Sequence, residues 1–317
     1  MPHPARRPSQ PPIPQRPDRV PLGIAMMLAF CALGPLIDVA AKFASQSVSV
    51  GQVTLARMVV QALLMAPIML IMRHGPRVNR AQMGLLTLRA GLLLASTFTF
   101  VSALQVMPIA DALAIIFVEP FIILALGAVL FGDLVGPRRI LASLVGFIGA
   151  LLVIQPNFVA FGAVALYPLG TALSFALYML VTRRISREVA PEPMQFHTAW
   201  LGVVIIAPIL ALGAGLDIEV LALSNPEPHV WGQLFAVGVA ASVAHMAITY
   251  ALHNAPSATL APLHYLEIIT AVLFGWLFFG DWPNPLSWTG IAVISASGLY
   301  IIARERTLAK QARLAKP

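Results

Sequence analysis

Residues 108–133 read PIADALAIIFVEPFIILALGAVLFGD, and residues 256–281 read PSATLAPLHYLEIITAVLFGWLFFGD. The two stretches align without a gap at an offset of 148, which places Glu119 on Glu267. Each stretch is strongly apolar, carries a single glutamate near its middle, and is long enough to cross a bilayer. The chain therefore contains an internal repeat of membrane-spanning segments with an acid at matching depths.

The composition of the whole chain also predicts a membrane protein. Only 10% of its 317 residues are charged and its mean hydropathy is +0.84, whereas a soluble domain usually carries about 25% charged residues. The net charge of +7 fits basic residues gathered in cytoplasmic loops, so we expect a lipid bilayer and no nucleic acid as partner. The single cysteine, Cys31, excludes an intramolecular disulfide framework and a cysteine-based metal site.

Ten apolar segments follow a proline- and arginine-rich stretch at residues 1–21, which we expect to be a disordered cytoplasmic tail. We expect the first five segments to form one unit, residues 22–154, and the last five to form a second, residues 162–303. Residues 304–317 are expected to be a basic cytoplasmic tail. The ten segments cover residues 22–43, 52–72, 82–106, 109–131, 138–154, 162–182, 195–213, 230–252, 257–279 and 286–302.

The distribution of basic residues predicts the orientation of this all-α membrane protein. If the chain crosses ten times, 17 of the 20 lysines and arginines fall in tails and loops on one side, which predicts that both termini are cytoplasmic. The fourth and ninth segments are then five crossings apart and run in opposite directions. The repeat is therefore inverted, with two five-helix halves related by a pseudo-two-fold axis in the membrane plane.

The repeated glutamates are the first candidates for function. Glu119 and Glu267 each lie about 11 residues into their segments, near the bilayer midplane at 1.5 Å per residue. Acids at this depth face the protein interior or a water-filled cavity, where a carboxyl group can exchange a proton near neutral pH. We predict that the pair binds substrate or couples transport to protons. The alternative is that each glutamate hydrogen-bonds a neighbouring helix and only holds the bundle together.

Histidines form a second group of candidates. His264 precedes Glu267 by three positions, so the two side chains share one helix face. The pair can relay protons or contact a polar ligand, or it can simply satisfy itself by a hydrogen bond. His245 and His253 match no metal-site spacing and are interpreted as structural, and we predict no metal site.

Further charges lie toward the ends of the segments. Asp38 and Lys42 are spaced i, i+4 near the outer end of the first segment, and Arg57 lies in the outer part of the second. They can neutralise one another, with Lys42 reaching the interface, or they can form an external gate or hold an anionic substrate. Asp111 is a candidate partner for Arg57. Arg89 is expected to reach the cytoplasmic surface, and a substrate contact is the alternative.

Prolines and aromatic residues bear on the shape of the site. Pro120 directly follows Glu119, and Pro262 lies five positions before Glu267. Proline removes a backbone donor, and irregular backbone near a midplane acid is where a transporter binds its substrate. Aromatic residues that could line a cavity for a planar ligand are Phe98, Phe100, Phe117, Tyr178, Tyr250, Tyr265 and Trp276.

Several motifs of other protein classes are missing from the sequence. It contains no G-x-x-x-x-G-K-[ST] of an ATP-driven pump and no H-E-x-x-H or G-x-S-x-G of a hydrolase. We therefore predict no enzymatic activity, no catalytic residues and no cofactor.

The repeat resembles the EamA-type drug/metabolite transporter family. The resemblance rests on ten helices in two related halves, whose fourth helices run from Glu119 to Gly132-Asp133 and from Glu267 to Gly280-Asp281. The family more often ends this motif with glutamate. The resemblance implies a central cavity lined chiefly by the third, fourth, eighth and ninth helices and opened alternately to each side. Arg57 resembles an arginine that the family often carries in its second helix.

These features predict a secondary active transporter of a small organic metabolite in the bacterial inner membrane, working by alternating access. From the resemblance and the aromatic residues, the leading substrate hypothesis is riboflavin or a similar vitamin-like compound. The alternatives are an amino-acid, metabolite or drug exporter and, from another class, a membrane-embedded enzyme or sensor. The predicted substrate-binding or proton-coupling residues are Glu119, Glu267, His264, Asp111, Arg57 and Tyr265, and the predicted structural or gating charges are Asp38, Lys42 and Arg89.

Overall fold

The computed structural model describes residues 19–72, 78–107, 109–131, 136–155, 162–280 and 282–314. Residues 1–18 of the predicted N-terminal tail lie outside this part, as do Gly132-Asp133 and Asp281 of the repeated motif. The regular structure of the described residues is helical, and ten helical units are long and apolar enough to cross a membrane. The predicted all-α, ten-span architecture is confirmed.

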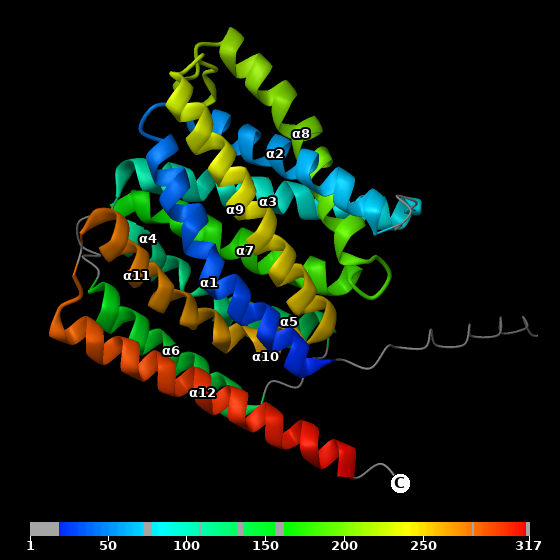
Figure 1. Cartoon of the computed structure of the whole chain (residues 1–317), viewed down its shortest axis with the longest axis vertical. Coiled ribbons are helices and arrows are strands. Elements are labelled where there is room, and N and C mark those ends of the chain that lie inside the picture. Colours follow the sequence, from blue (N-terminus) through cyan, green and yellow to red (C-terminus); the bar gives the residue numbers. More distant parts are fainter. Residues whose placement is uncertain are drawn as a thin grey trace, which may run out of the picture.

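The helices follow the chain in two sets of five spans (Figure 1). The first set consists of α1 (Val20–Ala44), α2 (Val50–Ile71), α3 (Arg80–Val106), the broken helix α4 (Ile109–Ile116) and α5 (Glu119–Phe131), and α6 (Pro137–Ile154). The second set consists of α7 (Leu166–Ile185) after the short η2 (Gly162–Ala165), α8 (Pro191–Gly215), α9 (Pro228–Asn254), the broken helix α10 (Ser257–Leu260), η4 (Ala261–Leu266) and α11 (Glu267–Phe279), and α12 (Pro285–Leu314). The short η3 (Glu219–Leu221) lies between α8 and α9.

Local sequence explains where these helices begin and end. Asn79 and Gln82 form a reciprocal capping box that starts α3, and Ser49 caps α2 by accepting from the Gln52 amide. Gly280, the glycine of the repeated motif, ends α11 in the left-handed conformation with φ +75°, which glycine adopts without a Cβ penalty. At the C-terminus, α12 continues to Leu314, so most of the predicted basic tail is helical.

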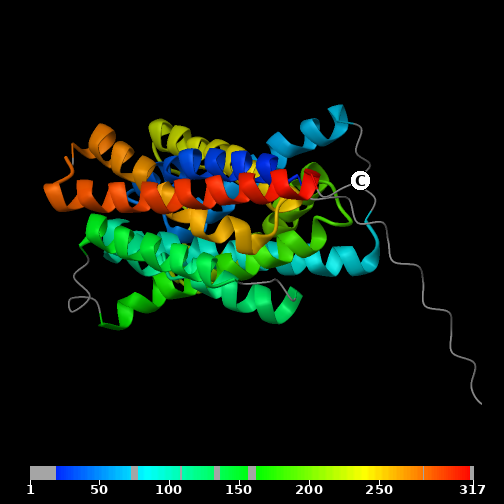
Figure 2. The same cartoon turned by 90° about the horizontal axis from the view of Figure 1, so that it is seen from below.

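The pairing of helices reflects the internal repeat. In the order of the ten spans, α1 is equivalent to α7, and α3 is equivalent to α9. The structure packs α1 along α9 and α7 along α3, so these two contacts are equivalent to each other. The equivalent helices α2 and α8 pack on each other, and so do α6 and α12. These two self-equivalent pairs lie at opposite edges of the bundle (Figures 1 and 2). This is the arrangement expected for two related halves around a pseudo-two-fold axis.

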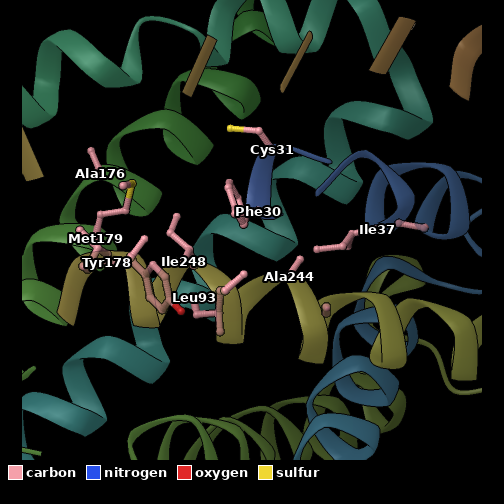
Figure 3. Close-up of a cluster of buried hydrophobic side chains, with 14 of the residues drawn as sticks. Phe30, Cys31, Ile37, Leu93, Ala176, Tyr178, Met179, Ala244 and Ile248 are labelled. Atoms are coloured by element: carbon pink, nitrogen blue, oxygen red, sulfur yellow. The ribbon is translucent and has the colours of Figure 1, made fainter. Parts of the chain in front are cut away.

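A large apolar cluster lies in the interior of the bundle between α1, α3, α7 and α9. Figure 3 shows this cluster, in which Phe30 and Cys31 come from α1, Leu93 from α3, Tyr178 from α7 and Ile248 from α9. Large apolar side chains are also exposed on the outer surface, for example Leu70 at 69%, Leu277 at 63% and Leu299 at 65%. Apolar side chains both inside and outside are what a bundle surrounded by lipid requires.

Both repeated segments are interrupted immediately before their glutamate. The sequence predicts one continuous helix over residues 109–131 and another over 257–279, but α4 ends at Ile116 and a 3₁₀ stretch separates α10 from α11. Pro120 lacks the amide that would bond the Ile116 carbonyl, and Pro262 lacks the amide that would bond Ala258. The two prolines are not at equivalent positions, yet each break places a glutamate on the first turn of the following helix half.

Candidate functional site

A partly open cavity lies between the two halves, at the level of the helix breaks. It encloses about 660 Å³ of empty space, its open mouth included. Seven spans contribute to its wall, four from the first half and three from the second. The lining residues are Phe30, Gly34, Ile37, Asp38, Arg57, Leu93, Ser96, Thr97, Phe100, Leu113, Ile116, Phe117, Glu119, Thr171, Phe175, His245, His264 and Glu267.

His264 joins the two repeated glutamates at this cavity. Its Nε2 lies 2.8 Å from Glu267 Oε2, and its Nδ1 lies 3.4 Å from Glu119 Oε2. The second distance is short enough for an ion pair, but the atoms are not aligned for a hydrogen bond, and Glu119 Oε1 is also buried without a hydrogen-bond partner. The Glu119 side chain is 1% exposed and that of Glu267 is 12% exposed. The two repeated carboxylates therefore share one imidazole.

Gly34 of α1 makes room for this cluster. A Cβ atom at this position would overlap the Glu267 carboxylate oxygen Oε1, so the absence of a side chain leaves room for the carboxylate against α1. On the next turn of α11, Thr270 donates a hydrogen bond to the Cys31 carbonyl of α1. The position of Glu267 is thus set by the contact between α1 and α11.

Arg57 is held by an equivalent pair of residues from the two halves. Its guanidinium donates to Thr97 Oγ1 of α3 at 2.6 Å and lies 2.6 Å from His245 Nε2 of α9. Thr97 and His245 are separated by the same offset of 148 that relates the two glutamates. Arg57 is 6% exposed and its Nε has no hydrogen-bond partner, so a buried donor remains next to the cavity.

Tyr265 and Phe117 are also equivalent at this offset, and they contact each other. Their ring centroids lie 5.6 Å apart, and the Tyr265 hydroxyl donates to the Phe117 carbonyl at 2.9 Å. That carbonyl is one that the break between α4 and α5 leaves without its usual helical partner, because the Phe121 amide bonds the Val118 carbonyl instead. Contact between equivalent residues places the two helix breaks at the pseudo-symmetry axis, and Tyr265 stabilises one of them.

Of the other charged residues predicted for the site, only some lie at the cavity. Asp38 lines the cavity together with Arg57, whereas Lys42 lies in the last turn of α1 and is half-buried. Asp111 lies in α4, but its side chain lies outside the described part of the structure. The expectation that Arg89 reaches the cytoplasmic surface is wrong, because its side chain is 0% exposed and is held inside the bundle. Threonine hydroxyls of α7, α8 and α9 supply acceptors that make this burial possible.

The aromatic wall of the cavity is only partly the predicted one. Phe100 and Phe117 line it as expected, while Trp276 is 45% exposed and packs on Trp282. The sequence reasoning missed Phe30 and Phe175, whose rings stack with centroids 6.2 Å apart. His245, interpreted from the sequence as structural, also lines the cavity, and its common offset with Thr97 is a signal that the sequence offers. Among the residues that the structure describes, no group of His, Cys, Asp and Glu has metal-binding geometry.

Ten spanning helices in two related halves, with charged and aromatic side chains around a central cavity, define a multi-pass membrane transporter by architecture. The profile of the EamA-like transporter family matches residues 21–155 and 162–304, so the chain belongs to this family. A solved crystal structure with 18% sequence identity has the same fold, with a TM-score of 0.70 over 87% of this chain and 94% of that chain.

Several curated proteins are similar to this chain. A riboflavin transporter of Brucella anthropi is 27% identical over 283 residues, which cover 88% of this chain and 98% of that protein. A riboflavin transporter of Rhizobium johnstonii is 35% identical over 210 residues, covering 65% of this chain and 66% of that protein. An S-adenosylmethionine uptake transporter of Rickettsia prowazekii is 21% identical, covering 90% and 93%. The family and these relatives are transporters of small metabolites, not enzymes.

Proposed function

We propose that this protein is a secondary active transporter of riboflavin, or of a similar flat, vitamin-like compound, in the bacterial inner membrane. The observation that carries the proposal is the composition of the cavity, where stacked aromatic rings lie beside a small set of buried polar groups. Pockets for organic ligands combine apolar and aromatic walls with a few placed polar groups in this way. The similarity to two riboflavin transporters supports the same substrate class.

The aromatic part of the wall suits a planar ring system. Phe30 and Phe175 come from the first span of each half and stack at an interplanar angle of 20°. Phe175 also stacks on Tyr178 at 19°, with centroids 5.4 Å apart. Because aromatic pairs gain about 0.5–1.5 kcal/mol beyond the area that they bury, a flat heterocycle that stacks on the cavity side of Phe30 or Phe175 is bound favourably.

We propose that transport is coupled to protons through Glu119, His264 and Glu267. Two carboxylates and one imidazole in contact can take up or release a single proton while the charge is redistributed inside the cluster. The cluster lies where the broken helices meet the cavity, so its charge can affect both the ligand and the packing of the two halves. In the alternating-access cycle, the cavity would open in turn to each side of the membrane around this fixed site.

A second substrate class has a specific observation in its favour. Asp38, Glu119 and Glu267 line the cavity, which gives it an acidic wall. A cationic, adenosine-bearing compound such as S-adenosylmethionine could use this wall, and the uptake transporter for that compound is similar over 90% of this chain. The two candidates differ in charge, so a direct competition distinguishes them.

The test is uptake of radiolabelled riboflavin into proteoliposomes with an imposed pH gradient. We expect saturable accumulation that unlabelled riboflavin blocks and that a protonophore abolishes. Phe175→Leu should raise KM by roughly 3- to 10-fold, because a stacking partner is lost. Phe278→Leu is the matched control, since Phe278 is 46% exposed on the outer surface. Uptake of S-adenosylmethionine without uptake of riboflavin would refute the leading substrate in favour of the second.

A further inference from the structure

Arg89 is the most deeply buried charge among the residues that the structure describes. Its side chain is 0% exposed, and its guanidinium donates hydrogen bonds to three other helices. The partners on α7 are Thr182 Oγ1 at 2.7 Å and the Tyr178 hydroxyl at 2.6 Å. Those on α8 are Thr198 Oγ1 and Gln195 Oε1, and α9 supplies Thr249 Oγ1 at 3.0 Å.

These acceptors are all uncharged, and each of the three guanidinium nitrogens has at least one of them. A cation in the membrane interior is costly, and it is retained only where the surrounding groups are fully arranged around it. Separation of α3 from α7 or α8 would remove two of these acceptors at once, and separation from α9 would remove one. Arg89 therefore favours the one arrangement in which the four helices are together.

The surroundings of Arg89 form the closed end of the molecule. We name this end, at which α3 begins, the Arg80 end. Toward it, Leu86, Ile185 and Met194 are each at most 1% exposed, in a separate apolar cluster between α3, α7 and α8. The cavity lies on the other side of Arg89, because its α3 lining residues are Leu93, Ser96, Thr97 and Phe100. Arg89 and this cluster thus separate the cavity from the Arg80 end.

A continuous chain of hydrogen bonds connects Arg89 to the cavity. The Tyr178 hydroxyl bonds Arg89 on one side and lies 3.0 Å from His245 Nδ1 on the other. His245 Nε2 lies 2.6 Å from the Arg57 guanidinium, which lines the cavity. Since a guanidinium only donates, His245 must accept through Nε2 and donate from Nδ1 to Tyr178. The Tyr178 hydroxyl then accepts from both His245 and Arg89, so a change at Arg57 that moves His245 also moves this acceptor of Arg89.

We propose that the hydrogen bonds of Arg89 form a lock that holds the Arg80 end of the transporter closed. His245 and Tyr178 are positioning residues, which transmit the binding of substrate at Arg57 to Arg89. A substrate oxygen that bonds Arg57 competes with His245 for the guanidinium. Released from Arg57, His245 is free to turn, and the Tyr178 hydroxyl that it bonds turns with it, away from Arg89. The proposal rests on the proposed transport function, but it concerns the step between binding and opening.

Tyr178→Phe is the decisive variant. It keeps the ring that stacks on Phe175 and lies under Arg89, with the guanidinium carbon 4.4 Å from the ring centroid, and removes only the hydroxyl. We expect riboflavin binding to purified protein to change by less than about threefold, while the maximal transport rate falls by roughly tenfold, because two buried hydrogen bonds of the chain are lost. Wild-type turnover in Tyr178→Phe would overturn the proposal.

Tyr250→Phe is the matched control. It removes a hydroxyl that bonds Glu192 between α9 and α8 but does not belong to the chain from Arg57 to Arg89. We expect its maximal transport rate to stay within about twofold of wild type. An equal loss of turnover in both variants would show a general effect of tyrosine hydroxyls in this region and would also overturn the proposal.

The state of the lock can be measured without any substrate. In a Cys31→Ser background, a reporter Met194→Cys lies in the buried cluster at the Arg80 end. We expect a water-soluble maleimide to label this cysteine about fivefold faster when Tyr178→Phe or Arg89→Gln is added, because the closed end opens more often. Unchanged labelling would exclude the lock, whereas faster labelling without riboflavin transport would refute only the proposed substrate.

Discussion

At the residue scale, the site combines symmetric acids with an asymmetric base. Glu119 and Glu267 occupy equivalent positions in the two halves, but the residue equivalent to His264 is Ile116. One imidazole therefore serves two carboxylates, and even a protonated His264 leaves one negative charge in the cluster. Because net charge in the membrane interior is costly, one further proton or a cationic group of the substrate stabilises the cluster.

Removal of either carboxylate should uncouple transport from the pH gradient. We expect Glu119→Gln and Glu267→Gln to lower pH-driven uptake by roughly tenfold or more, because the amide cannot exchange a proton, while ligand exchange across the membrane without net flux continues. Uptake and counterflow into proteoliposomes measure the two activities separately.

Glu188→Gln provides the control for these variants. Its exposed ion pair with Arg184, at 2.9 Å, contributes at most about 1 kcal/mol, so uptake and counterflow should both stay near wild type. Full pH-driven accumulation in both Glu119→Gln and Glu267→Gln would show that the acids are structural.

The glycine beside Glu267 should be required for transport, in contrast to a glycine that faces open space. In Gly34→Ala, the new methyl group would overlap the Glu267 carboxylate, so α1 or the carboxylate must move. We expect a loss of uptake of roughly tenfold, because misplacement of a binding group by about 1 Å is costly. Gly91→Ala on α3 meets no atom within 4 Å and should retain uptake. Equal activity of the two variants would contradict the tight contact.

At the scale of elements, the sequence predicts the spans well and their interruptions poorly. Composition and length predict that a segment such as residues 109–131 crosses the membrane, and the structure has ten helical units that are long and apolar enough to do so. The break before Glu119 depends on which carbonyls find a partner from another helix, as Phe117 does from Tyr265. That information lies in the tertiary contacts, and proline positions alone only suggest it.

The residues of the candidate site are likewise predictable from the sequence only in part. The repeat alone identifies Glu119 and Glu267, and the helical spacing adds His264. By contrast, Arg89 could not be placed from its position in α3, because its burial depends on hydroxyl and amide groups contributed by three other helices. His245 likewise gains its role only when α9 lies opposite Arg57 of α2.

The hydrogen bond at the helix break should contribute to stability. Tyr265→Phe leaves the Phe117 carbonyl without its donor at a position where the Tyr265 side chain is 1% exposed. We expect the free energy of unfolding to fall by about 1 kcal/mol, as measured by reversible denaturation in detergent. Tyr300→Phe on the outer surface, where Tyr300 is 48% exposed, should leave the stability unchanged. A loss as large in Tyr300→Phe would mean that the effect is not specific to the break.

At the scale of the whole molecule, the two halves form one structure rather than two neighbouring domains. The main contacts join helices of different halves, α1 with α9, α3 with α7, α2 with α8 and α6 with α12. Neither half could bury its apolar faces in the same way alone. Relative movement of the halves must therefore exchange these interfaces, and the cavity, the glutamate cluster and Arg57 all lie between them.

The orientation of this assembly in the membrane is a prediction from its charges and can be tested directly. Ten crossings place both termini on one face, and the distribution of lysine and arginine predicts that this face is cytoplasmic. In a Cys31→Ser background, Gln311→Cys near the end of α12 and Leu223→Cys between α8 and α9 both place a cysteine at an exposed position. In intact cells, we expect a membrane-impermeant maleimide to label Leu223→Cys only. Gln311→Cys should react only after the cells are opened, and labelling of both in intact cells would refute the predicted topology.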